Sequence, residues 1–541
     1  MNDIIKPFGL WQVLVMSMGV FSLVAFEEIS VFLKGTPRKR CRMEEAFEAK
    51  FGNLSIEEIN LFIQSNETDY EDFRGCVRFL YDWENFELNR SIIPQDAELE
   101  KCPLGYVMES NPMQMKMTAT EDMQLFCGEE WVSSAVISFY MLGMLLGFYS
   151  AGYAGDKFGR KPCFIVSSII HTCGGLLLTF APNKWAYLIS QIFIGMGGTV
   201  KMTMLCLIVF EITTANWRPF CTCLWTMLAS IVNRMSLILI AYLTQHWRYL
   251  SGGATLLTCL AYISILILPE SPRWYASRQR SDDVLRVLIR GYRWNHWGKR
   301  PSEDAENAIR SRIEEELARQ NSDTRVKQHL IQMLKNGQLR KVTFFGSILF
   351  TCHVTSYFGL LLYPGEIKAN VFLAAFFNCC FSMPGTFLAM FLYSRFRYRK
   401  RPLMGVFMVA MCFCTIGILI KAAIKPDNEI WLAIIIGGAF SMLEAAMDML
   451  YTYILELYPT SFRAKGLGFT SGFARFGAAL CSFINSLDSI SFSGTALVVY
   501  LLILSCACIS LLFLPDTDGV NVPDVIESIT KQEKSIPLST M

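Results

Sequence analysis

Long apolar stretches recur along the whole chain and are separated by short polar segments. A helix needs about 20 apolar residues to cross the hydrocarbon core of a bilayer, where every backbone polar group must be satisfied within the segment. The pattern therefore predicts an all-α membrane protein with about twelve transmembrane helices. The predicted helices start near Trp11, Ser133, Cys163, Trp185, Phe220, Tyr249, Thr343, Asn370, Leu403, Glu429, Leu467 and Gly494.

The first apolar run, Trp11 to Leu33, has a second interpretation as a signal peptide. It is long for that purpose, and Glu27 and Glu28 stand where a cleavage site would need small residues. A transmembrane helix is the favoured interpretation.

Two long polar segments interrupt the apolar pattern and divide the chain. One follows the first helix. The other lies mid-chain with apolar residues at helical spacing, which predicts short amphipathic helices. Bracing both halves is their favoured role, and a partner-binding site is the alternative. The predicted units are an N-terminal half (1–268) containing an extracellular loop (36–131), a cytoplasmic helical linker (269–342), a C-terminal half (343–515) and a cytoplasmic tail (516–541).

Composition supports the membrane interpretation. Of the 541 residues, 52% are hydrophobic and 18% are charged, which is too apolar for a soluble protein of this size. A formal net charge of +2 does not favour nucleic acid as a partner. The chain has no Walker-type phosphate loop, so ATP-driven pumping is not expected. No enzyme activity, cofactor or metal is predicted.

Basic residues predict the orientation in the membrane. Lys157, Arg160 and Lys161 fall between the second and third predicted helices, and a run from Arg395 to Arg401 falls between the eighth and ninth. Because lysine and arginine concentrate in cytoplasmic loops, both segments are placed in the cytoplasm. We therefore expect a multi-pass protein of the plasma membrane with both termini cytoplasmic.

The polar loop after the first helix carries two further signals of an extracellular position. It contains the three Asn-x-Ser/Thr sequons of the chain, at Asn53, Asn66 and Asn89, which predict glycosylation. It also contains four cysteines, Cys41, Cys76, Cys102 and Cys127, which an oxidising compartment would pair. Four cysteines allow three connectivities, and the sequence does not choose among them.

The two halves repeat each other. Glu211 and Arg218 have the same spacing at the end of the fourth helix as Glu456 and Arg463 at the end of the tenth. Pro269-Glu-Ser and Pro515-Asp-Thr end the sixth and twelfth helices at nearly the same offset. Parallel six-helix repeats are typical of transporters whose substrate site lies between the halves, near the middle of the membrane.

Several motifs resemble those of a known group. Gly152-Tyr-Ala-Gly-Asp156-Lys-Phe-Gly159-Arg160-Lys161 resembles the signature between helices 2 and 3 of the major facilitator superfamily. Pro269-Glu-Ser-Pro-Arg273-Trp and Glu456-Leu-Tyr-Pro-Thr-Ser-Phe-Arg463 resemble the organic cation, organic anion and carnitine transporter family within it, as does the glycosylatable loop. The resemblance covers nearly the whole chain and implies the major facilitator fold. Sugar porters share two of these motifs but have a short first loop and a paired-Gln motif that are missing here.

Two departures from the family leave the subfamily and the substrate open. The segment from Ser394 to Arg401 has no acid or glycine where the family repeats its first-half signature. Glu27 and Glu28 replace residues that are usually uncharged.

Ionisable and aromatic residues within the predicted helices are the candidates for substrate binding. An ionisable side chain at this depth costs about 2.5 to 3.5 kcal/mol, so it should face a cavity or a partner. Glu444 and Asp448 share one helical face and could bind a cation, take a proton or neutralise Arg475 or Arg234. His353 could act as a proton relay, but a satisfied interior histidine is the favoured interpretation. The predicted substrate-binding residues are Lys201, Tyr357, Phe358, Glu444, Asp448 and Arg475, with Lys201 preferred to Arg234 because the resemblance implies that helix 4 lines the cavity.

A second set of charges is predicted at the cytoplasmic helix ends. The resemblance implies that these residues form salt bridges between the halves and so hold an inner gate closed. The predicted gating residues are Asp156, Arg160, Glu211, Arg218, Glu456 and Arg463.

The function predicted from these features is transport of small organic ions by alternating access. Arg475 favours an anion or a carnitine-like zwitterion, because the anion and carnitine branches of the resembled family carry Arg in this context. A cation remains possible. The alternative is a transport-inactive receptor or scaffold derived from a transporter. The expected partners are a small organic ion and membrane lipid, and a coupling ion is left open.

Overall fold

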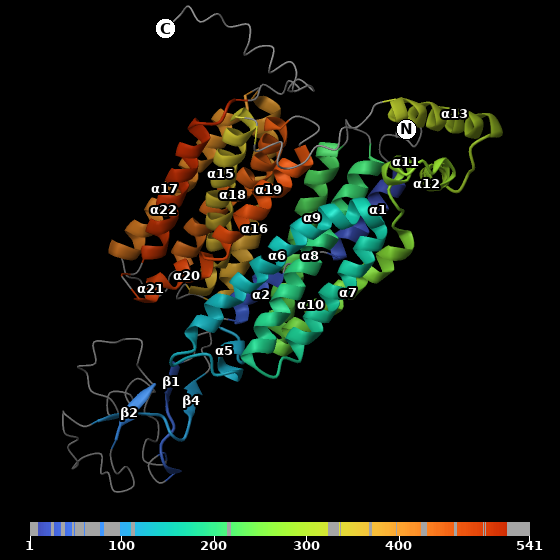
Figure 1. Cartoon of the computed structure of the whole chain (residues 1–541). Helices are drawn as coiled ribbons and strands as arrows, with labels where there is room; N and C mark the ends of the chain where they lie inside the picture. The colour runs from blue at the N-terminus through green and yellow to red at the C-terminus, as the bar shows by residue number, and fades with distance from the viewer. Residues whose placement is uncertain are drawn as a thin grey trace, which may run out of the picture.

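The computed structural model describes a helical membrane bundle with a small loop domain at one end (Figure 1). The described residues are 9–22, 26–33, 38–45, 48, 59, 76–80, 98–109, 114–213, 218–322, 335, 337–366, 370–396, 398–423, 430–458, 463–490, 492 and 494–516.

Two helical bundles lie side by side, one from each half of the sequence (Figure 1). The helices of the N-terminal half are α1 (Leu10–Ser22), α2 (Phe26–Leu33), α6 (Glu130–Phe158), α7 (Arg160–Thr179), α8 (Lys184–Ile212), α9 (Arg218–Thr244) and α10 (Trp247–Ile267). Those of the C-terminal half are α15 (Gly337–Leu362) with the 3-10 helix η4 (Tyr363–Glu366), α16 (Val371–Arg395), α17 (Lys400–Ala423), α18 (Ile430–Leu457), α19 (Arg463–Ala478), α20 (Cys481–Asn485), α21 (Leu487–Ile490) and α22 (Thr495–Leu512).

The helices agree with the predicted spans. Within the described part of the chain, ten helices are long and apolar enough to cross a membrane. The helix α9 and the pair α1 and α2 occupy the two other predicted positions. The first residues of these helices lie within several residues of the predicted starts.

The two polar segments lie at opposite ends of the bundle (Figure 1). In the loop, β1 (Arg38–Cys41) pairs antiparallel with β4 (Tyr106–Glu109), β2 (Val77–Phe79) pairs with β3 (Leu99–Lys101), and α5 (Ala119–Asp122) follows. The linker forms α11 (Pro272–Ser277), α12 (Ser281–Asn295) and α13 (Glu303–Ser322). We call these two ends of the molecule the loop side and the linker side.

Small residues allow close packing of equivalent helix pairs in the two halves. A Cβ atom added at Gly143 of α6 would lie 2.3 Å from the carbonyl oxygen of Ile192 in α8. One added at Gly385 of α16 would lie 2.3 Å from the carbonyl oxygen of Ser441 in α18. Close backbone approach through glycine is the usual way to pack helices in a membrane, and here it repeats with the sequence.

The linker helices pack on the N-terminal half. The backbone amide of Trp11 in α1 donates to Oδ1 of Asn295 in α12 at 2.8 Å, and Asn295 donates to Gln12 at 3.1 Å. Apolar residues of α12 and α13, such as Leu288 and Ile313, share a buried cluster whose other members belong to the N-terminal half and to the linker helix α11. The expectation that the linker braces both halves is therefore not met by its described helices, because their apolar faces are covered by one half.

Candidate functional site

Arg475 of α19 lies at the boundary between the two halves. Its guanidinium carbon is 5.1 Å from the ring centroid of Phe148 in α6 and 5.5 Å from that of Phe358 in α15. The residue is only 5% exposed, and its Nε and Nη1 atoms have no hydrogen-bond partner among the described residues. Stacking on two rings stabilises the cation without using these N–H donors, so they remain able to bind an anionic group.

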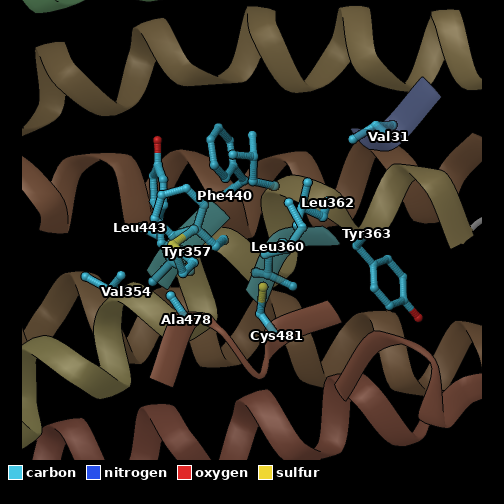
Figure 2. Close-up of a cluster of buried hydrophobic side chains, with 14 of the residues drawn as sticks. Val31, Val354, Tyr357, Leu360, Leu362, Tyr363, Phe440, Leu443, Ala478 and Cys481 are labelled. Atoms are coloured by element: carbon cyan, nitrogen blue, oxygen red, sulfur yellow. The ribbon is translucent and has the colours of Figure 1, made fainter. Parts of the chain in front are cut away.

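A hydrogen-bonded chain crosses the same boundary. Arg234 of α9 donates to the hydroxyl of Tyr357 in α15 at 3.2 Å, and this hydroxyl donates to Glu444 of α18 at 2.9 Å. The guanidinium of Arg234 also lies 5.3 Å from the ring centroid of Phe440. Tyr357 belongs to an apolar cluster formed by residues of both halves, where Figure 2 shows it beside Phe440 and Leu443. Apolar packing thus positions the hydroxyl that links an arginine of one half to a carboxylate of the other.

The two acids of α18 differ in their partners. Glu444 accepts the hydrogen bond from Tyr357, whereas the carboxylate of Asp448 has no hydrogen bond or ion pair within the described part of the chain. No ion pair joins Arg475 to either acid in that part. Direct neutralisation of Arg475 by these acids is therefore not observed, and Glu444 reaches Arg234 only through Tyr357.

A small cavity lies between the halves next to this chain. It is lined by Val31 and Phe32 of α2, Arg234 of α9, and Asn378 of α16, together with other apolar side chains. Asn378 donates to the carbonyl of Leu361 at 3.1 Å, and its buried Oδ1 atom has no partner among the described residues. Sequence reasoning missed Asn378, although a lone amide in an otherwise apolar helix was a visible signal, and it ranked Arg234 below Lys201.

Lys201 lies within the N-terminal half. Its Nζ atom is 2.8 Å from Nδ1 of His171 in α7, and both residues are almost fully buried. The ring of Phe26 packs edge-on against His171. The structure therefore brings Tyr357, Phe358, Glu444 and Arg475 to the boundary between the halves but places Lys201 against a histidine of its own half. A substrate role for Lys201 stays a prediction.

His353 differs from the expected satisfied interior histidine. It is fully buried in α15, and neither ring nitrogen has a hydrogen-bond partner in the described structure. Its ring centroid lies 6.1 Å from that of Tyr357 and 5.8 Å from that of Phe407. The expectation of internal satisfaction is wrong because neither ring nitrogen finds a hydrogen-bond partner among the described residues.

On the linker side of the N-terminal half, charged residues join three helices. Arg160 at the start of α7 contacts Asp156 of α6 at 3.2 Å and Glu211 of α8 at 3.5 Å. Glu270, which follows α10, accepts the backbone amides of Arg160 at 2.9 Å and Lys161 at 3.1 Å. A carboxylate at a helix N-terminus is stabilised by the free amides and the helix dipole. Gly159 makes the sharp connection possible with a φ of +107°.

The C-terminal half has a corresponding cluster. Arg399, just before α17, contacts Glu456 of α18 at 3.3 Å. Asp516, which follows α22, accepts the backbone amide of Lys400 at 3.0 Å. The second half thus repeats the geometry of the first, even though its connecting segment lacks the acid of the family signature.

These contacts change the interpretation of the gating set. Asp156, Arg160, Glu211 and Glu456 lie on the linker side, but each described ion pair joins helices of one half. Arg218 and Arg463 begin α9 and α19, and their side chains lie outside the described part of the structure. Glu211 and Glu456 also interact beyond these pairs, so salt bridges between the halves stay a prediction. A role in gating stays a prediction.

Described contacts between the halves also occur on the loop side. The ring of Phe372 at the start of α16 lies 5.8 Å from Phe32 at the end of α2 and 5.8 Å from Tyr242 near the end of α9. Ser138 of α6 donates to the carbonyl of Ala479. The loop-side ends of the two halves are therefore in contact.

The loop contains two disulfides, Cys41–Cys102 and Cys76–Cys127, so all four predicted cysteines are paired. The predicted glycosylation sites Asn53, Asn66 and Asn89 lie outside the described residues. Near the first disulfide, burial alone would raise the pKa of Glu48, but hydrogen bonds from Arg40 and the amide of Met43 hold this pKa below its ordinary value.

Comparison with known proteins adds sequence and fold relatives. Residues 77–525 match the family described as "Sugar (and other) transporter". The human organic cation/carnitine transporter 2 is 27% identical over 93% of this chain and 88% of that protein. Bovine solute carrier family 22 member 1 is 26% identical over 94% of this chain and 88% of that protein.

A solved structure shares the fold. The xylose transporter XylE from E. coli, in an inward-open conformation, superposes with a TM-score of 0.55 at 16% sequence identity. The match covers 73% of this chain and 88% of that one. At this level of identity the likeness speaks to the fold alone.

Proposed function

Because this chain belongs to the sugar (and other) transporter family of the major facilitator superfamily, we propose that it carries a small organic anion or zwitterion across the plasma membrane by alternating access. Membership confirms the predicted fold and the predicted relationship to organic ion transporters. The family consists of transporters, not enzymes.

Arg475 carries the proposal of an anionic group. Its guanidinium is buried between a ring of each half and keeps two N–H positions without a partner among the described residues. A buried donor without a partner costs about 1 to 3 kcal/mol, which a carboxylate or sulfate could recover by bidentate binding. Contact with both halves also suits alternating access, because a site built from both halves changes its geometry when one half moves relative to the other.

Asp448 supports a zwitterion. Its carboxylate is not bonded to described residues and lies on α18, one turn from Glu444. A substrate with a carboxylate and a quaternary amine could use Arg475 for one pole and Asp448 for the other, with Tyr357 and Phe440 offering ring faces to the cation. Carnitine-like compounds have this charge pattern.

Alternating access is supported by the way the polar segments are attached. The linker packs on the N-terminal half, and Met117 in the loop exchanges backbone hydrogen bonds with Gln245 and Trp247 of the same half. Loop, linker and N-terminal helices would therefore move together against the C-terminal half. In this proposal the loop side is extracellular and both termini are cytoplasmic.

The test is uptake by proteoliposomes that contain wild-type protein, Arg475→Ala or Arg475→Lys. Loss of the bidentate contact should reduce carboxylate uptake by Arg475→Ala at least tenfold, from about 1.5 to 3 kcal/mol for a charged hydrogen bond. Arg475→Lys should recover part of it, because the charge remains but the planar fork does not. Normal carboxylate uptake by Arg475→Ala would contradict the proposal.

A panel of cations, anions and zwitterions in the same vesicles separates transport from the receptor alternative. A transporter shows saturable uptake that is stimulated by unlabelled substrate on the opposite side. Binding without such counterflow would favour a receptor or scaffold. Uptake of permanent cations alone would overturn the anion or zwitterion preference.

A further inference from the structure

A charged pocket lies on the linker side, away from the boundary between the halves. It forms where the start of α7, the segment after α10 and the linker helix α12 meet. Its charged lining residues are Lys161, Glu270, Asp283, Arg286 and Arg290. Nothing in the proposed transport cycle uses this pocket.

The two acids of the pocket are already engaged. Glu270 accepts three backbone amides, those of Arg160, Lys161 and Ser271, at 2.8 to 3.1 Å. Asp283 is paired with Arg286 at 2.7 Å and with Arg280 on its other oxygen. Their oxygens are therefore occupied by donors that belong to the protein.

Two cations of the pocket keep free donor capacity. Arg290 gives one N–H to the carbonyl of Leu266 at 3.1 Å, and no described ion pair involves Arg290 or Lys161. Lys161 and Arg290 line the same pocket, so their like charges repel each other. A bound anion with several oxygens would relieve this repulsion and accept the remaining N–H groups.

The pocket lies at the edge of the apolar part of the bundle. Leu266, whose carbonyl accepts from Arg290, is 76% exposed in the last turn of the membrane helix α10, as expected for a side chain that contacts lipid. At the end of α12, Trp297 is 88% exposed and Trp294 is 40% exposed. Exposed tryptophans are typical of the boundary between hydrocarbon and headgroups.

We infer that this pocket binds the phosphate of an anionic lipid headgroup in the cytoplasmic leaflet. Lys161 and Arg290 contact the phosphate oxygens, and Leu266 lies beside the acyl chain. A basic pocket at this level of a membrane protein suits such headgroups. The inference uses the proposed topology but does not depend on the transported substrate, so it can fail while the transport proposal holds, and the reverse.

The test measures the Tm of the full-length protein in detergent at increasing lipid concentrations, with tryptophan fluorescence as the signal for unfolding. Short-chain phosphatidylinositol bisphosphate should raise the Tm in a saturable way, because a ligand of the folded state stabilises it. Short-chain phosphatidylcholine at the same concentration should not. In the double variant Lys161→Gln, Arg290→Gln, the lipid concentration at half effect should rise about tenfold or more.

The matched control removes the same charge from the exposed part of the linker, as Arg300→Gln with Arg312→Gln, and should keep the wild-type midpoint. The conservative pair Lys161→Arg, Arg290→Lys should also keep it, which separates lost charge from disturbed packing. Equal midpoints for the two glutamine doubles would overturn the pocket as the site. Inorganic phosphate acting at the same concentration as the lipid would overturn a lipid as the occupant.

Discussion

The linker-side ends of the two halves reach the same geometry with different residues. In the N-terminal half, Arg160 contacts Glu211 while Glu270 receives the first amides of α7. In the C-terminal half, Arg399 contacts Glu456 while Asp516 receives an amide of α17. Both halves therefore have a carboxylate at the start of a helix and an arginine that bridges to a second helix. The repeat preserves this arrangement more closely than it preserves the identity of the residues.

The two linker-side clusters differ in whether a further helix packs on them. Trp274 of α11 and Arg278, which follows this helix, donate to the backbone carbonyl of Asp156 at the end of α6. In the second half, Lys400 itself donates to the carbonyls of Leu512 and Leu514 at the end of α22, and no separate helix covers the cluster among the described residues. We therefore expect the first cluster to be the more sensitive to mutation.

The strongest test of this difference is the connection between the helices. Gly159→Ala forces a residue with a Cβ into a φ of +107° and brings that atom to 2.5 Å from Oε2 of Glu270. We expect a loss of about 2 to 4 kcal/mol in stability, from backbone strain and a broken charged contact. The corresponding Tyr398→Ala in the second half should cost much less, because Tyr398 does not have a positive φ. The measurement is Tm and surface abundance, and equal losses would remove the asymmetry.

The helix-capping carboxylates give the next largest effect. Glu270→Gln keeps the shape but loses the charge that faces the amides of α7, so we expect about 1 to 2 kcal/mol of destabilisation in this buried position. Asp516→Asn acts on one described amide at an exposed position and should cost about 0.5 kcal/mol. Thermal unfolding of both variants in the same detergent measures the difference. A larger effect for Asp516→Asn would reverse the proposed ranking.

A smaller effect on stability, but a visible one on turnover, is expected for Asp156. Its side chain is 81% exposed, so the contact with Arg160 should contribute less than about 1 kcal/mol. If the cluster acts as a gate, Asp156→Ala should lower turnover severalfold with little change in apparent affinity. Arg395 occupies the corresponding place in the second half, and Arg395→Ala serves as the control. Altered selectivity with normal turnover would show that Asp156 does not act as a gate.

The smallest effect is expected for the ion pair between Arg40 and Glu48 in the loop. It measures how much stability an ion pair outside the membrane contributes to this protein. Because the folded-state pKa of Glu48 is lowered, its stabilisation is present above its ordinary pKa of 4.5 and is lost as the pH falls through the lower value. Amide exchange in β1 should therefore speed up as the pH falls below about 4.5, beyond the intrinsic pH dependence. Glu48→Gln should abolish this extra acceleration, and its persistence would assign it to another group.

Periodicity and repeats predicted the larger part of the architecture. The apolar runs located the membrane-spanning helices. A segment in lipid must form its backbone hydrogen bonds internally, so each span can be recognised from its own residues. The four loop cysteines were identified as a set, but their pairing depends on which strands lie side by side. The segment from Ser394 to Arg401 lacks the acid of the family signature, so the sequence did not predict a charged cluster there. The acid of this cluster, Asp516, comes from a segment that is distant in the sequence.

The candidate site was only partly predictable. Arg475, Tyr357 and Glu444 stood out because polar groups within apolar runs need partners. Phe148 and Asn378 were missed: the first is one apolar residue among many, and the second matters through the cavity that it lines. Lys201 was preferred to Arg234, yet rotation of the helices turned Lys201 toward His171 and Arg234 toward the other half.

The sequence by itself determined that the chain is a two-fold repeated membrane transporter with a disulfide-rich loop, because length, polarity and spacing act within single segments. Only the tertiary structure decided which polar residues meet. It put Arg475 between rings of both halves, routed Glu444 to Arg234 through Tyr357, and docked the linker on one half. Those outcomes depend on helix rotation and on the packing of helices far apart in the chain, and hydrophobic patterning constrains these weakly when nearly every face of a helix is apolar.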